Sequence, residues 1–226
     1  MTDNHAEMIT ELAKTTRSGI EALSKFSSFF APIARIPIEA VRAIWEPRLA
    51  YMQAENFLIF MERYNALLEK HGIPRSTRVV PLKFGIPLIN AAILENDELL
   101  RDAWAKLLIN ATDADSGIEM RRAYIDILEN LTSLDVKNLT AIYPALPDYD
   151  AAYLAAYLPD KLVLHENNNK DYPDTPRHID ISLHNLHRLG CVHNMAFWGS
   201  KGTFTFVKIA ALGEALVEAC TLRNNG

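Results

Sequence analysis

Hydrophobic residues recur every three or four positions along most of the chain, which is the period of an amphipathic α-helix. This period predicts helices over residues 4–26 and 37–71, with Pro37 in the first turn of the second. Gly72 and Pro74 mark the end of the long helix. Its apolar stripe comprises Phe57, Phe60, Met61, Tyr64, Leu67 and Leu68.

The middle of the chain predicts shorter helices separated by polar breaks. Residues 81–94 are apolar and predicted to be helical, with a kink or a split at Pro87. Asn96 is expected to cap a short helix that opens with Asp97 and Glu98, since acids are favoured at the positive end of the helix dipole.

Two later helices are predicted to begin at caps. Ser116 and Glu119 have the spacing of a capping box and precede a helical stripe that ends at Leu131. Thr132 and Asp135 have related spacing and open the next helix.

A polar loop at 159–176 separates this region from a different pattern. Residues 148–158, rich in Tyr and Ala, predict one more short helix before the loop. The loop contains three consecutive Asn and several Pro, a composition that cannot bury one face. After it, a leucine stripe predicts a helix that ends at Gly190.

The end of the chain predicts a β-hairpin and a closing helix. Phe204 and Phe206 alternate with threonines, which is the period of a strand, and a glycine-containing turn separates them from the preceding apolar segment. Residues 210–222 return to the helical period. A helix followed by a hairpin and a closing helix is the order of a winged-helix module.

The pattern as a whole predicts a mainly α protein, with a multi-helix N-terminal portion and a C-terminal winged-helix-like module containing one small β-hairpin. We expect N-terminal helices over 1–75, central helices over 76–131 and the winged-helix-like module over 132–226. The apolar stretch 26–34 and the long helix over 37–71 make homo-oligomer formation an additional expectation.

Charge weakens the interpretation of the module as a DNA reader. The net charge is −5, so the whole chain lacks the basic footprint of a nucleic-acid-binding protein, although residues 177–226 alone carry +2. The candidate DNA contacts on the predicted helix and wing are Arg177, His184, Asn185, Arg188 and Lys201. These cations are few for phosphate binding, so packing or partner binding is the favoured role and DNA the alternative. Trp198, at the predicted hairpin tip, is a candidate partner contact.

No catalytic or cofactor-binding motif occurs in the sequence, so no catalytic residue and no cofactor are predicted. His184, His187, Cys191 and His193 are residue types that zinc accepts, but their spacing matches no known site. Leu183 and Leu186 occupy the buried stripe, which places His184 and His187 toward solvent. We therefore expect no metal site.

The cellular location follows from three absences. Only two cysteines occur, there is no signal-peptide layout, and no uncharged apolar run reaches the about 18–20 residues that span a bilayer. A cytoplasmic protein without a transmembrane segment is expected.

Several segments together resemble one protein family. Residues 78–113 contain a Pro-Leu stretch at Pro87, an acidic break and the helix WAKLLIN, and residues 124–139 read YIDILENLTSLDVKNL. With LLEKHGI upstream and SLHNLHRLGCV and LGEALVEAC downstream, they resemble the Abi-alpha family of abortive-infection proteins over roughly residues 38–221. Cys191 departs from the aliphatic residue usual there, and Ile209-Ala210 from the usual Leu-Thr.

The resemblance implies a bacterial phage-defence protein that halts the growth of the infected host, and it implies no catalytic residues. We therefore predict phage defence by growth arrest or host-cell death, through binding to an unidentified protein partner or phage trigger. A winged-helix DNA-binding regulator is the first alternative. An enzyme whose active site is assembled from scattered helix residues is the second.

Overall fold

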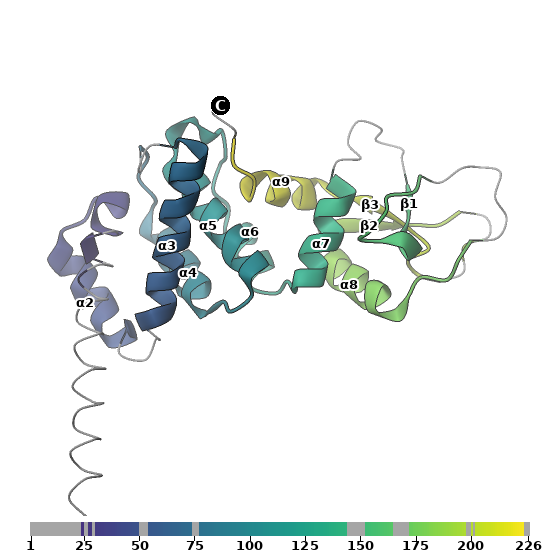
Figure 1. Ribbon diagram of the computed structural model, residues 1–226, viewed down its shortest axis with the longest axis horizontal. Helices are drawn as coiled ribbons and strands as arrows, with labels where there is room; N and C mark the ends of the chain where they lie inside the picture. Colours follow the sequence, from purple (N-terminus) through teal and green to yellow (C-terminus); the bar gives the residue numbers. More distant parts are fainter. Residues whose placement is uncertain are drawn as a thin grey trace, which may run out of the picture. The chain divides into compact units, whose positions relative to one another are not determined.

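The computed structural model describes residues 24, 27–28, 30–49, 54–73, 77–143, 152–164, 172–197, 200 and 202–223. The chain is mainly helical, with one small antiparallel sheet near its C-terminus, as predicted (Figure 1). It divides into two compact units. The N-terminal unit comprises residues 1–96, 104–120 and 222–226, and the C-terminal unit comprises residues 97–103 and 121–221.

The N-terminal unit is built from helices that bury one apolar face each. They are α2 (Ile38–Leu49), α3 (Ala54–His71), α4 (Leu82–Leu94) and the greater part of α5 (Glu98–Thr112). The predicted stripe of α3 is confirmed, because Phe57, Phe60 and Tyr64 are buried. Most of the predicted helix over 4–26 and residues 50–53 of the predicted long helix lie outside the described residues.

Of the kink or split predicted at Pro87, the split does not occur. Helix α4 continues through Pro87 to Leu94, although proline offers no N–H to the helix. Leu88, Ile89, Ala92 and Ile93 are all buried beyond the proline. Their removal from water favours the continued helix over a break.

The first turn of α5 is capped one residue later than predicted. The Asp97 Oδ1 atom accepts hydrogen bonds from the backbone N–H groups of Leu99 at 2.9 Å and Leu100 at 3.1 Å, so Asp97 takes the role expected of Asn96. The helix is also not short, because it extends for 15 residues. Its apolar positions Leu100, Trp104 and Leu107 are buried over that length, which explains the extension.

The predicted capping box at Ser116 and Glu119 is absent. Asp113 instead caps the 3₁₀ helix η1 (Ala114–Ser116), by accepting from the backbone N–H of Asp115 at 2.9 Å. Gly117 ends this turn at a φ of 71°, a conformation that glycine adopts without strain. Helix α6 (Arg122–Leu128) then begins without a side-chain cap.

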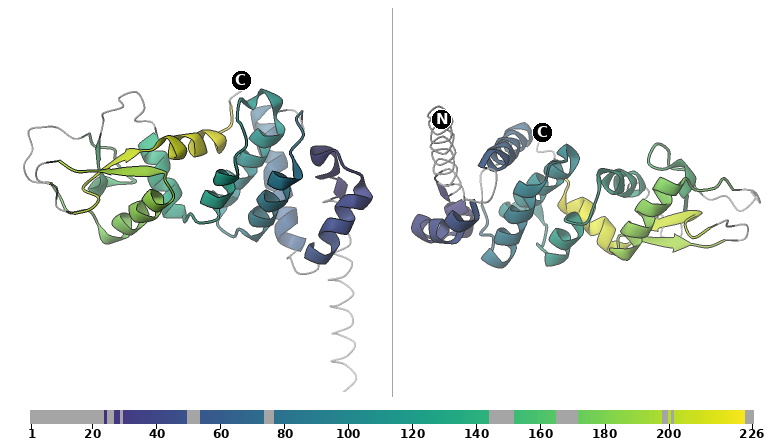
Figure 2. Two further views of the ribbon diagram at one scale, coloured as in Figure 1. Left: turned by 180° about the vertical axis from the view of Figure 1, so that it is seen from behind. Right: turned by 90° about the horizontal axis from the view of Figure 1, so that it is seen from below.

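The C-terminal unit contains the sheet and the helices around it. Its elements after α6 are α7 (Ser133–Ile142), β1 (Tyr153–Leu154), η3 (Ala155–Tyr157), α8 (Arg177–Arg188), β2 (Val192–Met195), β3 (Phe206–Ile209) and α9 (Ala211–Ala219). The sheet is antiparallel in the order β1-β3-β2, so the predicted hairpin is confirmed and gains a third strand. Figure 2 shows α8 beside the strands of this hairpin.

Two local predictions in this unit were wrong. Within residues 148–158, the described part forms β1 and the 3₁₀ helix η3 instead of an α-helix, because Leu154 pairs with Phe206 and is buried against it. The second hairpin strand begins at Phe206, and residues 204–207 are all buried. The alternating exposure expected from Phe204 onward is lost because both faces of this segment are covered.

Candidate functional site

A buried polar network joins α7 to α8, and the Asp135 carboxylate lies at its centre with 1% of the residue exposed. The predicted capping box is confirmed at this point. The Asp135 Oδ2 atom accepts from the backbone N–H and from the hydroxyl of Thr132, both at 2.8 Å. The carboxylate therefore satisfies the first turn of α7, where the helix dipole also favours a negative charge.

The donors from α8 complete the network. The Ser182 hydroxyl donates to Asp135 Oδ1 at 2.6 Å, and the Asn138 amide donates to Ser182 Oγ at 2.9 Å. The Asn185 amide donates both to Asp135 Oδ2, at 3.1 Å, and to the backbone carbonyl of Asn130, at 2.8 Å. These neutral donors stabilise a buried carboxylate, and they fix the rotation of α8 about its own axis.

The rotation of α8 determines which side chains it presents to solvent. Ile179, Ser182, Leu183 and Leu186 are buried on its inner side. The exposed residues of α8 are Arg177, His178, Ile181, His184, His187 and Arg188. Four of them, Arg177, Ile181, His184 and Arg188, follow one stripe at helical spacing opposite the buried side, and we call these four residues the α8 outer face. Ile181 is 59% exposed, which is unusual for a large apolar side chain in the middle of a helix.

The two histidines of α8 are oriented by backbone carbonyl groups. The Nδ1 atom of His184 lies 2.8 Å from the Asp180 carbonyl oxygen, and that of His187 lies 2.9 Å from the Val192 carbonyl oxygen. A carbonyl oxygen can only accept, so each Nδ1 carries the hydrogen and the neutral ring keeps its lone pair on Nε2. Both rings also pack edge-on against Phe204, with centroid distances of 4.8 Å and 5.7 Å.

The predicted DNA-contact residues separate into three groups. Arg177, His184 and Arg188 lie on the α8 outer face. Asn185 is half-buried. Its amide nitrogen donates to Asp135 Oδ2 and to the Asn130 carbonyl oxygen, and its amide oxygen accepts from Arg188 Nη2 at 2.8 Å. Lys201, like the partner-contact candidate Trp198, lies outside the described residues.

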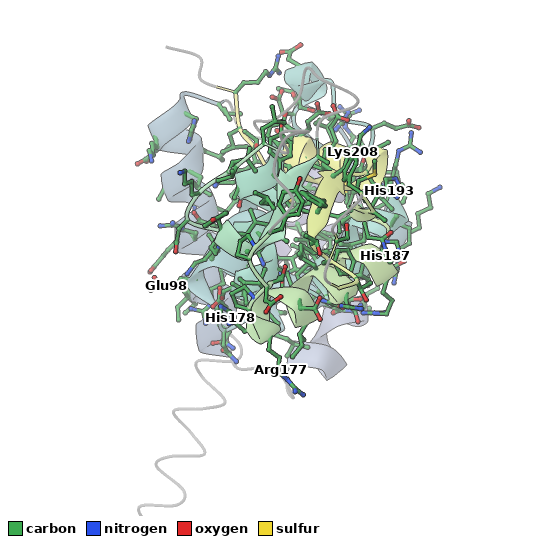
Figure 3. All side chains as sticks on the ribbon, turned by 90° about the vertical axis from the view of Figure 1, so that its right-hand side faces the viewer. Glu98, Arg177, His178, His187, His193 and Lys208 are labelled. Carbon is green, nitrogen blue, oxygen red and sulfur yellow. The ribbon has the colours of Figure 1, made fainter. Side chains whose placement is uncertain are left out.

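Basic and imidazole groups continue from α8 onto the sheet. His193 on β2 lies directly opposite Lys208 on β3. Figure 3 shows His187, His193 and Lys208 along one side of the C-terminal unit, with Arg177 at the start of α8. His187 belongs to α8, and its hydrogen bond to the carbonyl oxygen of Val192 joins this helix to strand β2. An anionic partner would thus meet several cationic or titratable groups here.

Comparison with known proteins identifies the family. The sequence model of the abortive infection alpha family matches residues 53–220, about three quarters of the chain. The chain belongs to the abortive infection alpha family. The predicted resemblance is confirmed. Neither the curated proteins nor the solved structures contain a significant match to the chain.

Two of the segments that resemble the abortive infection alpha family have a structural role in the network between α7 and α8. The segment LTSLDVKNL supplies Thr132, Asp135 and Asn138, and SLHNLHRLG supplies Ser182 and Asn185. All five belong to the network between α7 and α8. Asn138 and Ser182 were missed in the sequence, where their only signal is a polar residue on an otherwise apolar helix face.

No three of His184, His187, Cys191 and His193 are placed together as metal ligands. Within the described residues, no group of three His, Cys, Asp or Glu side chains is placed to hold a metal ion. Burial, with a smaller contribution from the nearby Asp135 charge, raises the pKa of the Cys191 thiol to about 11. Zinc binds the thiolate, which this environment disfavours. In the same described part of the chain, no helix is both long and apolar enough to cross a bilayer.

Proposed function

We propose that this chain is a bacterial abortive-infection protein that acts in the cytoplasm and defends its host against phage. It halts growth or kills the infected cell through binding to a protein partner or a phage trigger. The observation that carries the proposal is the family match over residues 53–220. The network around Asp135 supports a binding role. Its hydrogen bonds orient α8, and the α8 outer face stays exposed to solvent, where a partner can reach it.

The experiment is expression of the full chain in a phage-sensitive bacterium, followed by challenge with a panel of unrelated phages. We expect at least one phage to form fewer plaques, and we expect cells infected by that phage to stop growing. The Asp135→Ala variant, whose α7–α8 network is broken, is expected to lose this protection. Unchanged plating and growth for every phage would contradict the proposal.

A DNA-binding regulator is the second candidate, and the sheet order favours it. In a winged-helix module one strand precedes the recognition helix and a hairpin follows it, and β1, α8 and the β2–β3 hairpin follow this order. Among the described residues between β1 and α8, the 3₁₀ helix η3 is the one helical element. Binding of duplex DNA with a steep salt dependence, weakened by Arg188→Glu, is the result that would support this candidate.

A further inference from the structure

We propose that the α8 outer face binds an acidic, amphipathic helical segment of the partner protein. This inference rests on the proposed function, because it assigns the site and the chemical class of the partner through which the chain acts. The occupant is defined by three properties of the face: an apolar centre, cationic ends and a fixed orientation.

Ile181 supplies the apolar centre. It is the most exposed large hydrophobic residue of the C-terminal unit among those that the structure describes. It lies between Arg177 and His184 along the stripe. An apolar side chain enclosed by charged neighbours matches the arrangement of interfaces, in which an apolar anchor is buried at the centre and polar groups form the rim. The partner must therefore present an apolar residue to Ile181.

Arg177 and Arg188 supply the cationic ends. They occupy the first and last positions of α8, eleven residues and about 16 Å apart along the helix axis. The one acid in the sequence of α8 is Asp180, and its Oδ2 atom lies 3.6 Å from His184 Nδ1. A partner helix with two acids eleven residues apart, and apolar residues between them, matches this spacing.

The face is held in place before a partner arrives. Arg188 donates to Asn185, Asn185 donates to Asp135, and Asp135 is fixed at the first turn of α7. His184 is held by the Asp180 carbonyl and by the ring of Phe204. Ordering these side chains in advance lowers the entropic cost of binding.

These contacts favour a protein over duplex DNA. Asn185 is the side chain of α8 best suited to read adenine, and its amide is already committed to the α7–α8 network. Ile181 gains more from an apolar partner residue than from a phosphate backbone.

The probe is a stapled helical peptide of about 15 residues. It carries two Glu eleven positions apart and two Leu on the same stripe between them. Binding of the full chain is measured by fluorescence anisotropy at low salt. The control peptide has both Glu replaced by Lys, and a random-sequence duplex DNA is the competitor. We expect the acidic peptide to bind, the Lys peptide not to bind, and the duplex not to compete.

The variants locate the site. Ile181→Asp and Arg177→Glu are expected to weaken peptide binding by at least about tenfold, while their unfolding midpoints stay at the wild-type value because both residues are exposed. Lys70 is an exposed residue of α3, so Lys70→Glu makes the same charge change as Arg177→Glu on another surface and is expected to leave binding unchanged. Equal binding of both peptides, displacement by the duplex, or wild-type affinity of the two α8 variants would overturn the inference. Phage protection by the wild-type chain without peptide binding defeats this inference alone, whereas peptide binding without protection defeats the proposed function.

Discussion

The hydroxyl of Ser182 on α8 donates a hydrogen bond to the carboxylate of Asp135 on α7 over 2.6 Å, and both residues are buried. The two residues are 47 positions apart in the chain. This bond and its neighbours make the polar network a structural element of the C-terminal unit, and they decide which residues α8 presents to solvent.

Replacing Asp135 with Ala is expected to lower the free energy of unfolding by about 3 kcal/mol. The change leaves the donors of Thr132, Ser182 and Asn185 without their shared acceptor. Urea unfolding of the full chain measures the effect. Asp126→Ala is the control, because Asp126 is exposed and pairs with Arg122 in the same helix at 2.9 Å. If both variants unfold at the wild-type midpoint, the network does not stabilise the fold.

Replacing Gly213 with Ala is expected to destabilise the C-terminal unit by several kcal/mol, on the order of 3. The added carbon would overlap the backbone carbonyl of Cys191, which already accepts from the Ala210 N–H at 2.9 Å. Backbone atoms at this point cannot move aside without breaking the contact between Gly213 of α9 and Cys191, the residue before β2. Gly202→Ala serves as the comparison, because nothing lies within 4 Å of the added carbon there. Thermal unfolding should separate the two variants, and equal melting temperatures would count against this close approach.

Replacing Ser133 with Ala is expected to cost about 1 kcal/mol of stability at neutral pH. The Ser133 hydroxyl donates to the Asp97 carboxylate, and this bond, followed by that from the Leu100 N–H, lowers the pKa of Asp97 below 3.8. Because the folded-state pKa is depressed, the stabilisation is complete above about pH 4 and is lost as the pH falls through the lowered value. The stability difference between wild type and variant should therefore shrink in acid. A difference that stays constant from neutral pH to pH 2 would show that the bond does not depend on the charge.

The Cys191 thiol is expected to react slowly with alkylating reagents at neutral pH. Burial and the nearby Asp135 charge raise its pKa to about 11, so the thiolate fraction is very small, and the side chain is covered as well. Mass spectrometry of the folded chain after brief alkylation should show modification at Cys220, which is half-buried, before Cys191. Preferential modification of Cys191 would contradict the burial described here.

Local signals in the sequence predicted much of the fold. Thr132 and Asp135 identified the start of α7. The leucine stripe identified α8, and Gly190, which has a φ of 75°, lies two residues beyond its last residue Arg188. The strand at Tyr153 could not be predicted, because its partner Val207 is more than 50 positions away and the residues on either side of the strand are helix-forming alanines. Pairing across that distance decided its structure.

The same limit applies to the site. The exposure of His184 and His187 followed from the positions of Leu183 and Leu186, and it is confirmed. The role of Asn185 did not follow, because its acceptor Asp135 lies 50 positions earlier and on another helix. A polar side chain on a helix looks the same in sequence whether it faces solvent or a buried carboxylate.

We propose that this member of the abortive infection alpha family stops phage propagation through the α8 outer face. The most direct measurement is the number of progeny phage per infected cell, in a host that carries the wild-type chain, Ile181→Asp or Lys70→Glu. We expect the wild-type chain and Lys70→Glu to reduce the yield at least about tenfold, and we expect Ile181→Asp at equal protein level to leave the yield of an unprotected host. A yield that the wild-type chain leaves unchanged, or that Ile181→Asp still reduces, would contradict this proposal.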